Sequence, residues 1–377
     1  MRFSLKIQKD MDKKFVMGIA AMAALTLVSC SSDDLDSFSD NSSKNEAISF
    51  DGYLGRSAVA VNGSRGSVET VTTLENNGFG VFSKYTGTGS FSDFANQQVT
   101  YKYSKWTYTP IKYWPTTAGQ IDFYAYAPYD KNTTLTENSK INFTVEKNVA
   151  KQKDLLWARV HSQINTPITS TNNKVSFKFA HALSRLGYTI KLHEQYPSAK
   201  FTLKKITLAG SPDETTNAFY TKGIIDLSTV KNVPTGDAPT GLWDTSSSAK
   251  QNFDWFSGTY ENLSETASNP DKDNNYLFVI PQNFSDNIGT VEHPVEHPDK
   301  LYVIVQYTIK YDGAGEQTNT VYKQIQKDFK QGKAYMLNLT IGLPIEFDVN
   351  VTNGVDDWGA DEGINIGSDG NLWDGIE

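Results

Sequence analysis

From about residue 47 onward, hydrophobic residues fall in short runs separated by Gly, Asn, Asp, Ser and Pro, which is typical of strands and turns. The pattern is clearest at residues 174–179, where Val175, Phe177 and Phe179 alternate with polar residues, as in a strand with one buried face. The run 301–309 starts apolar on both faces, which favours a central strand. The pattern predicts strands at residues 47–50, 80–84, 121–127, 141–145, 174–179, 187–192, 201–208, 276–281, 301–311, 318–325, 334–341 and 345–351.

Many short strands with turn signals between them predict an all-β fold of antiparallel sandwiches rather than repeated strand and helix units. A chain of 377 residues is too long for one small sandwich, so we predict two domains in tandem. The strand pattern breaks at residues 193–200. We therefore expect an N-terminal sandwich over residues 57–194 and a C-terminal sandwich over residues 195–358.

Composition supports a folded chain without nucleic acid as a partner. Only 38% of residues are hydrophobic, but 19 Tyr, 20 Phe and 7 Trp supply the large apolar surfaces that disordered chains lack. The net charge of −8 gives no basic face for phosphate binding.

Residues 1–29 have the pattern of a signal peptide. Lys13 and Lys14 precede an apolar run at residues 15–28, which is too short for a membrane-spanning helix of about 20 residues. Met11 is then the more natural start of the chain than Met1.

Cys30 is the single cysteine of the chain, which excludes a disulfide within it. The residues before Cys30 are Leu27, Val28 and Ser29, and they resemble the lipobox of bacterial lipoproteins. We therefore predict cleavage before Cys30 and a lipid on its side chain. The Ser-, Asn- and Asp-rich residues 30–46 would then be a polar tether.

Motifs for catalysis are missing, since the sequence has no Gly-rich phosphate loop, nucleophile elbow or zinc-protease motif. Two histidines, His293 and His297, lie in a tandem Val-Glu-His-Pro repeat, whose side chains are of types that bind divalent metals. A stiff surface loop is the alternative, and we favour it because one loop lacks the supporting residues that orient metal ligands. We predict no enzymatic activity, no cofactor and no metal.

Aromatic residues are dense at residues 101–115 and include Trp106 and Trp114. Their faces could stack on sugars, whereas their spacing by two is also what a sandwich core requires. We favour the core interpretation and keep a sugar contact at these two tryptophans as the alternative.

Several framework motifs together resemble the fimbrillin family of Bacteroidales. They include Ile-Lys-Tyr-Trp-Pro at 111–115, Ile-Asp-Phe-Tyr-Ala-Tyr-Ala-Pro at 121–128 and Asp-Leu-Leu-Trp-Ala at 154–158. The others lie at residues 175–186, 276–282, 333–339 and 356–358. The resemblance covers nearly the whole chain after the tether.

The resemblance implies two transthyretin-like sandwiches in a lipoprotein exported through the periplasm to the outer membrane and the cell surface. It also implies assembly into a fimbrium with other subunits. An arginine-specific protease would remove the N-terminal strand, residues 47–56, by cutting after Arg56 or alternatively after Arg65. A strand from another subunit would then fill the groove by donor-strand exchange.

The tail, residues 359–377, is a candidate donor strand. Its apolar residues are Ile364, Ile366, Leu372, Trp373 and Ile376. A terminus without fixed structure is the alternative for this segment. For the whole chain, the alternative is a monomeric adhesin or glycan-binding lipoprotein of the same fold, with a ligand on a host or bacterial surface.

Overall fold

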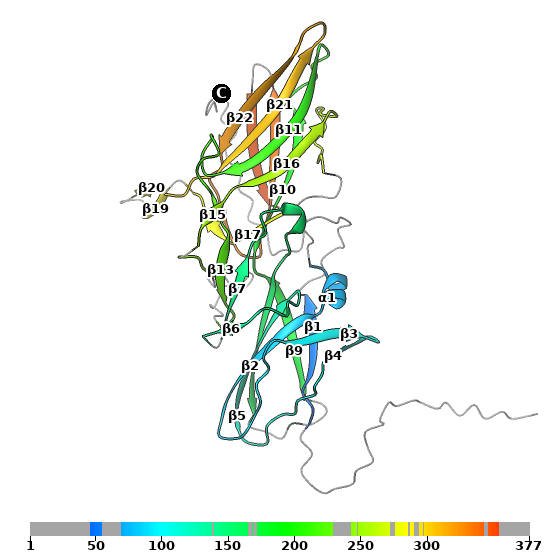
Figure 1. Cartoon of the computed structure of the whole chain (residues 1–377), viewed down its shortest axis with the longest axis vertical. Helices are drawn as coiled ribbons and strands as arrows, with labels where there is room; N and C mark the ends of the chain where they lie inside the picture. Colours follow the sequence, from blue (N-terminus) through cyan, green and yellow to red (C-terminus); the bar gives the residue numbers. More distant parts are fainter. Residues whose placement is uncertain are drawn as a thin grey trace, which may run out of the picture. The chain divides into compact units, whose positions relative to one another are not determined.

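The computed structural model places strands along most of the chain between residues 46 and 353 (Figure 1). All described residues belong to one compact unit. None of the helices in these ranges is long and apolar enough to cross a membrane. The structure describes residues 46–54, 69–137, 139–164, 168, 172–228, 243–246, 248–271, 276–285, 287–289, 294–296, 298–342 and 346–353.

Seven strands form the largest sheet, in the order β1-β9-β8-β5-β2-β3-β4. In β9 the apolar residues Val175, Phe177 and Phe179 are buried and the lysines and serine between them are exposed, as their alternation predicts. The strands are β1 (Ser49–Leu54), β2 (Phe79–Gly87), β3 (Gln97–Lys102), β4 (Lys105–Thr107), β5 (Gly119–Ala127), β8 (Leu156–Ile164) and β9 (Lys174–His181).

The α-helix α1 (Val71–Asn77) lies between β1 and β2 in the sequence. Thr70 caps its N-terminus, because the Thr70 hydroxyl accepts a hydrogen bond from the Thr73 backbone N–H and the Thr73 hydroxyl accepts one from the Thr70 N–H. Gly78, with φ of 68°, follows the last helical residue. A helix this short buries only Leu74, so no 3.6-residue period predicts it.

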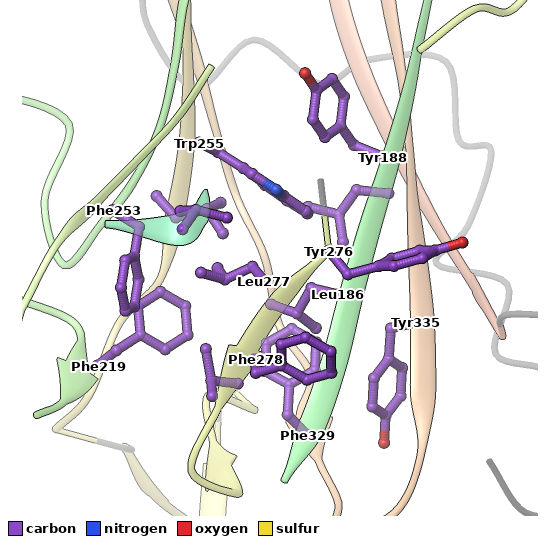
Figure 2. Close-up of a cluster of buried hydrophobic side chains, with 14 of the residues drawn as sticks. Leu186, Tyr188, Phe219, Phe253, Trp255, Tyr276, Leu277, Phe278, Phe329 and Tyr335 are labelled. Atoms are coloured by element: carbon purple, nitrogen blue, oxygen red, sulfur yellow. The ribbon is translucent and has the colours of Figure 1, made fainter. Parts of the chain in front are cut away.

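Two four-stranded sheets form most of the C-terminal half and share one hydrophobic core. Figure 2 shows part of this core, where the rings of Tyr188 and Trp255 meet edge to face with their centroids 4.8 Å apart. One sheet has the order β17-β10-β24-β25, with β10 (Ser184–Leu192), β17 (Leu277–Val279), β24 (Ala334–Gly342) and β25 (Glu346–Asn353). The other has the order β16-β11-β21-β22, with β11 (Ala199–Ala209), β16 (Phe253–Tyr260), β21 (Tyr302–Tyr311) and β22 (Glu316–Gln324).

Smaller sheets complete the described fold. One has the order β14-β13-β7-β6, with β6 (Leu135–Thr136), β7 (Lys140–Thr144), β13 (Lys222–Asp226) and β14 (Trp243–Asp244). The two-stranded sheets pair β12 (Phe219–Tyr220) with β15 (Lys250–Gln251), β18 (Gln282–Asn283) with β23 (Asp328–Phe329) and β19 (Asn287–Gly289) with β20 (Pro294–Glu296). A short 3₁₀ helix, η1 (Val149–Lys151), precedes β8.

Strand pairs cross the predicted domain boundary between residues 194 and 195. β10 lies before this position but pairs with β17 and β24, and β7 pairs with β13. The division into two domains stays a prediction, and the pairing of β10 with β17 and β24 makes β10 part of a sheet whose other strands follow residue 195.

The sheets are not purely antiparallel, so this part of the sequence prediction is wrong for two pairs. β1 runs parallel to β9, and β10 runs parallel to β24. Alternation of apolar and polar residues specifies which face of a strand is buried, but it does not specify the direction of the neighbouring strand. Each predicted strand range overlaps an observed strand. The strands that were not predicted are β3, β4, β8, β13 and β16 and the short strands β6, β12, β14, β15, β18, β19, β20 and β23.

Candidate functional site: the N-terminal edge strand

β1 lies at one edge of the seven-stranded sheet and pairs only with β9 in that sheet. The parallel register places Ser49 beside Lys174 and Leu54 beside Phe179. An ion pair of 2.8 Å joins the Lys174 ammonium to the Asp51 carboxylate across the two strands. Both of these side chains are largely exposed, so this pair adds little stability.

The inward face of β1 is apolar and buried. Phe50 is 3% exposed and Leu54 is 7% exposed, and Ile48, just before the strand, is also buried. Gly52 lies on the same face, where an added Cβ atom would come within 3.0 Å of the Phe79 ring and 3.2 Å of the Phe179 ring. The glycine therefore lets β1 approach the core closely.

Phe50 is the largest side chain that β1 buries. Its ring centroid lies 5.1 Å from that of Tyr108, 5.2 Å from Phe94, 5.8 Å from Phe177 and 6.0 Å from Phe123. Edge-to-face, tilted and stacked contacts at these distances are favourable for aromatic rings. This pocket for one ring makes Phe50 the main anchor of the strand.

Residues just before β1 are held by the segment that follows β4. The Trp114 N–H donates to the Glu46 carbonyl oxygen and the Ile48 N–H donates to the Lys112 carbonyl oxygen, each at 2.9 Å. The Tyr108 hydroxyl donates to the Ile48 carbonyl oxygen at 2.7 Å. β1 is thus fixed by one sheet neighbour, one aromatic pocket and a few hydrogen bonds at its start.

Removal of such a strand has a predictable physical effect. The freed edge of β9 would have unpaired backbone groups, and the pocket around Phe50 would be open to solvent. An exposed edge beside an apolar groove is a template for another extended segment.

The model of the fimbrillin-like family matches residues 67–358. The chain belongs to the fimbrillin-like family. This family is structural and non-enzymatic, which confirms the prediction that the chain has no enzymatic activity.

Known proteins similar to this fimbrillin-like chain include fimbrium subunit Fim1C of Phocaeicola vulgatus, which is 29% identical over 195 residues. That alignment covers 45% of this chain and 49% of Fim1C, so it spans about half the length of the relative. A crystal structure of a fimbrial protein from Bacteroides vulgatus aligns with a TM-score of 0.56 and 21% identity. It covers 82% of this chain and 99% of the crystallised one, and it confirms a β-rich fold of the fimbrial type.

Most of the predicted site residues of this fimbrillin-like chain lie outside the described residues. They are Leu27, Val28, Ser29 and Cys30 of the lipidation motif, Arg56 and Arg65 of the protease sites, Ile364, Ile366, Leu372, Trp373 and Ile376 of the tail, and His293 and His297 of the repeat. Their roles stay predictions. Within the described ranges, no group of three or more His, Cys, Asp or Glu side chains is placed to hold a metal ion.

The two tryptophans of the sugar-contact alternative are both packed against the sheet. Trp114 is 4% exposed and its indole N–H donates to the Asn173 carbonyl oxygen at 3.1 Å. Trp106, in β4, is half-buried between Phe79 and Tyr101, with ring centroids 4.8 Å and 5.0 Å away. Burial leaves Trp114 no free face for a sugar, and it supports the core interpretation of this stretch.

A buried polar cluster lies where the described chain resumes after β1, and sequence reasoning did not find it. The Glu69 side chain is 1% exposed, and its backbone N–H donates to the Asp154 carboxylate at 3.1 Å. Asp154 is fully buried and also contacts the His181 ring nitrogen Nδ1 at 2.7 Å. The cluster ties residue 69 to the ends of β8 and β9.

Glu69 has a pKa that burial shifts far from its ordinary value. Burial raises the pKa of its carboxyl from 4.5 to about 7, against hydrogen bonds from Thr73 and Asn77 that lower it, and the nearby Asp154 carboxylate raises it further. Oxygen Oε2 of Glu69 accepts no hydrogen bond in the described part of the chain. Near neutral pH, the buried carboxyl is therefore close to losing its proton.

Proposed function

We propose that this chain is a structural subunit of a cell-surface fimbrium, and that a strand from another subunit replaces β1 during assembly. The observation that carries the proposal is the geometry of β1, which buries its inner face in the core yet has only β9 as a sheet neighbour. The sequence similarity to a fimbrium subunit supports the same role.

The position of β1 relative to the predicted protease sites supports its removal. Arg56 lies two residues after the last residue of β1, and Arg65 lies two residues before residue 67, where the family match begins. The match thus leaves out β1, and it also leaves out the tail at 359–377. A cut at either arginine would separate β1 from the rest of the chain.

The tail is the proposed donor. Ile364 and Ile366 are spaced by two, as are Ile48 and Phe50 of the segment they would replace, so both could point into the same groove. A tail strand would restore the backbone pairing with β9 and fill the aromatic pocket.

The proposed export route starts from a lipoprotein precursor with its lipid on Cys30, transported through the periplasm to the outer membrane and the cell surface. The cut after β1 would remove the lipid together with residues 30–56, and neighbouring subunits would then retain the mature chain. We also propose the finer description of the fold as two transthyretin-like sandwiches.

Digestion of the precursor with an arginine-specific protease tests this function. We expect N-terminal sequencing to find a new chain start at Ser57, and SDS-resistant oligomers to form on incubation. Arg56→Ala combined with Arg65→Ala should reduce those oligomers to the level of the undigested protein, because β1 then remains attached to the chain.

The single variants identify the cut that is used: Arg65→Ala should leave the new chain start at Ser57 and the oligomers unchanged, whereas Arg56→Ala should move the chain start to Gly66. A chain start at Gly66 in the digested parent would assign the cut to Arg65. If the double variant still forms oligomers after digestion, or if the digested parent stays monomeric, the proposal of strand exchange is wrong.

A further inference from the structure

The sequence pattern of β1 recurs in the tail. Both segments contain Ile-x-x-Asp-Gly-x-Leu, first at residues 48–54 and again at residues 366–372. In the first copy, each of the shared residues has a defined place beside β9 or in the core under it. The recurrence therefore indicates which tail residues suit the groove that β1 would leave.

The shared apolar residues mark the two ends of the buried face of β1. Ile48 is 1% exposed and Leu54 is 7% exposed. Ile366 and Leu372 have the same separation along the chain, and an even separation places both side chains on one face of an extended strand. The tail thus carries an apolar side chain for each end of the groove.

The shared glycine suits the tightest point of the groove. A Cβ atom added to Gly52 would lie 3.0 Å from the Phe79 ring and 3.2 Å from the Phe179 ring. A replacement strand in the same register therefore fits best with a glycine at this point. Gly370 has the corresponding position in the second copy.

The direction of the tail follows from the residues on either side of this glycine. In the parallel direction Asp369 takes the place of Asp51, whose carboxylate lies 2.8 Å from the Lys174 ammonium. In the opposite direction, with the glycine at the same point, Asp374 would take the place of Ile48 in the core. Burial of an unpaired carboxylate is costly, so the parallel direction is favoured.

An Asp-Gly pair is also a turn signal. Ile309, Asp312 and Gly313 repeat part of the pattern, and this Asp-Gly pair lies at the turn between β21 and β22, where Gly313 has φ of 75°. A glycine, not a leucine, completes that third segment at position 315. The tail shares its final leucine with β1 and not with this turn, which favours the extended form.

The two copies differ at the aromatic pocket. Ser368 stands where β1 has Phe50, whose ring contacts four other aromatic rings. A serine side chain fills only a part of that pocket, so the tail lacks the main anchor of β1. An attached β1 therefore holds the groove against the tail of another subunit until it is cut off.

We propose that the tail enters the groove parallel to β9, in the register that places Gly370 at the position of Gly52, and this register rests on the strand exchange proposed above. Ile366 and Leu372 then occupy the two ends of the groove. Ser368 lies in the aromatic pocket and leaves most of it unfilled.

Ser368→Phe tests the register by the direction of its effect. The new ring should fill the aromatic pocket, so oligomers of the digested variant should dissociate in urea about tenfold or more slowly than those of the digested parent. Asn371→Phe is the matched control, because residue 371 would lie at the position of Tyr53, which is 47% exposed. Its oligomers should dissociate at the parent rate.

Gly370→Val and Gly367→Val form a second matched pair. The first would bring methyl groups against the Phe79 and Phe179 rings and should lower the yield of oligomer about tenfold or more. The second lies at the position of Ser49, outside the buried face, and should leave the yield unchanged. Urea unfolding of the uncut variants, which should match that of the parent, controls for the fold.

The register is wrong if Ser368→Phe weakens the oligomers or acts like Asn371→Phe, if Gly370→Val assembles like the parent, or if Gly367→Val does not assemble. A tail shifted by two residues, for example, would place Ser368 at Gly52, and its replacement by phenylalanine would then prevent assembly. Strand exchange itself is judged from the digested parent. If the parent forms oligomers, these outcomes overturn the register alone, and if it stays monomeric, both proposals are wrong.

Discussion

Replacing Phe50 by alanine is expected to lower the free energy of unfolding by about 3 to 5 kcal/mol, the usual cost of deleting a buried aromatic side chain. Phe50 is 3% exposed and its ring touches four other aromatic rings. The loss should be large because those rings belong to separate strands and loops, which cannot all move to fill the space. Urea unfolding of the uncut chain, followed by tryptophan fluorescence, measures the change.

The control is Tyr53→Ala, which removes an aromatic side chain from the outward face of the same strand. Tyr53 is 47% exposed, so we expect a change within about 0.5 kcal/mol. Equal effects of the two variants would show that β1 is not anchored by its inner face. The groove described above would then lose its physical basis.

Replacing Glu69 by glutamine is expected to remove a pH dependence of stability between pH 4.5 and pH 7. The folded chain binds the Glu69 proton more tightly than the unfolded chain, because the pKa is about 7 in the fold and 4.5 ordinarily. Stability from this group is thus fully present below pH 4.5 and is lost as the pH rises through 7. The shift corresponds to about 3 kcal/mol, at about 1.4 kcal/mol for each pH unit.

Urea unfolding at a series of pH values measures this effect. Above pH 7, Glu69→Gln should be more stable than the parent by up to about 3 kcal/mol, and the two should converge near pH 4.5. Glu261→Gln is the control. Lys200 lowers the pKa of Glu261, so this variant should still lose stability between pH 4.5 and pH 7, as the parent does. A Glu69→Gln curve parallel to that of the parent would contradict the assignment.

The position of most of the longer strands could be predicted from the sequence because each has its own local signal. Alternation in β9 identifies Val175, Phe177 and Phe179 as one buried face, and the structure confirms it. The parallel direction of β1 has no local signal, since it results from where the chain passes between β1 and β9. Helix α1 was not predicted because a single buried residue, Leu74, gives no period.

The candidate site was predicted only in part. The run at residues 47–50 identified the start of β1, but nothing local showed that Phe50 would meet Tyr108, Phe123 and Phe177. In the cluster of Glu69, Asp154 and His181, Glu69 lies 85 positions before Asp154 in the sequence, and Asp154 lies 27 positions before His181. Such a cluster forms only when β8 and β9 lie side by side, so pairs of acidic residues in the sequence could not reveal it.

A reversible covalent lock on β1 tests the central claim, that β1 must leave before subunits assemble. Ser49 and Lys174 are paired in the β1–β9 register, and neighbouring strands lie within the Cα separation of about 4.4 to 6.8 Å that a disulfide spans. The variant combines Ser49→Cys and Lys174→Cys with Cys30→Ser, so that no other thiol competes. Its disulfide would tether β1 to the rest of the chain even after the protease has cut at Arg56.

The measurement is the amount of SDS-resistant oligomer after digestion of this variant, with the disulfide oxidised and then with it reduced. The account predicts monomers while the disulfide is intact and oligomers at the parent level once it is reduced. Equal amounts of oligomer in the two states would contradict it, because subunits would then assemble with β1 still in place.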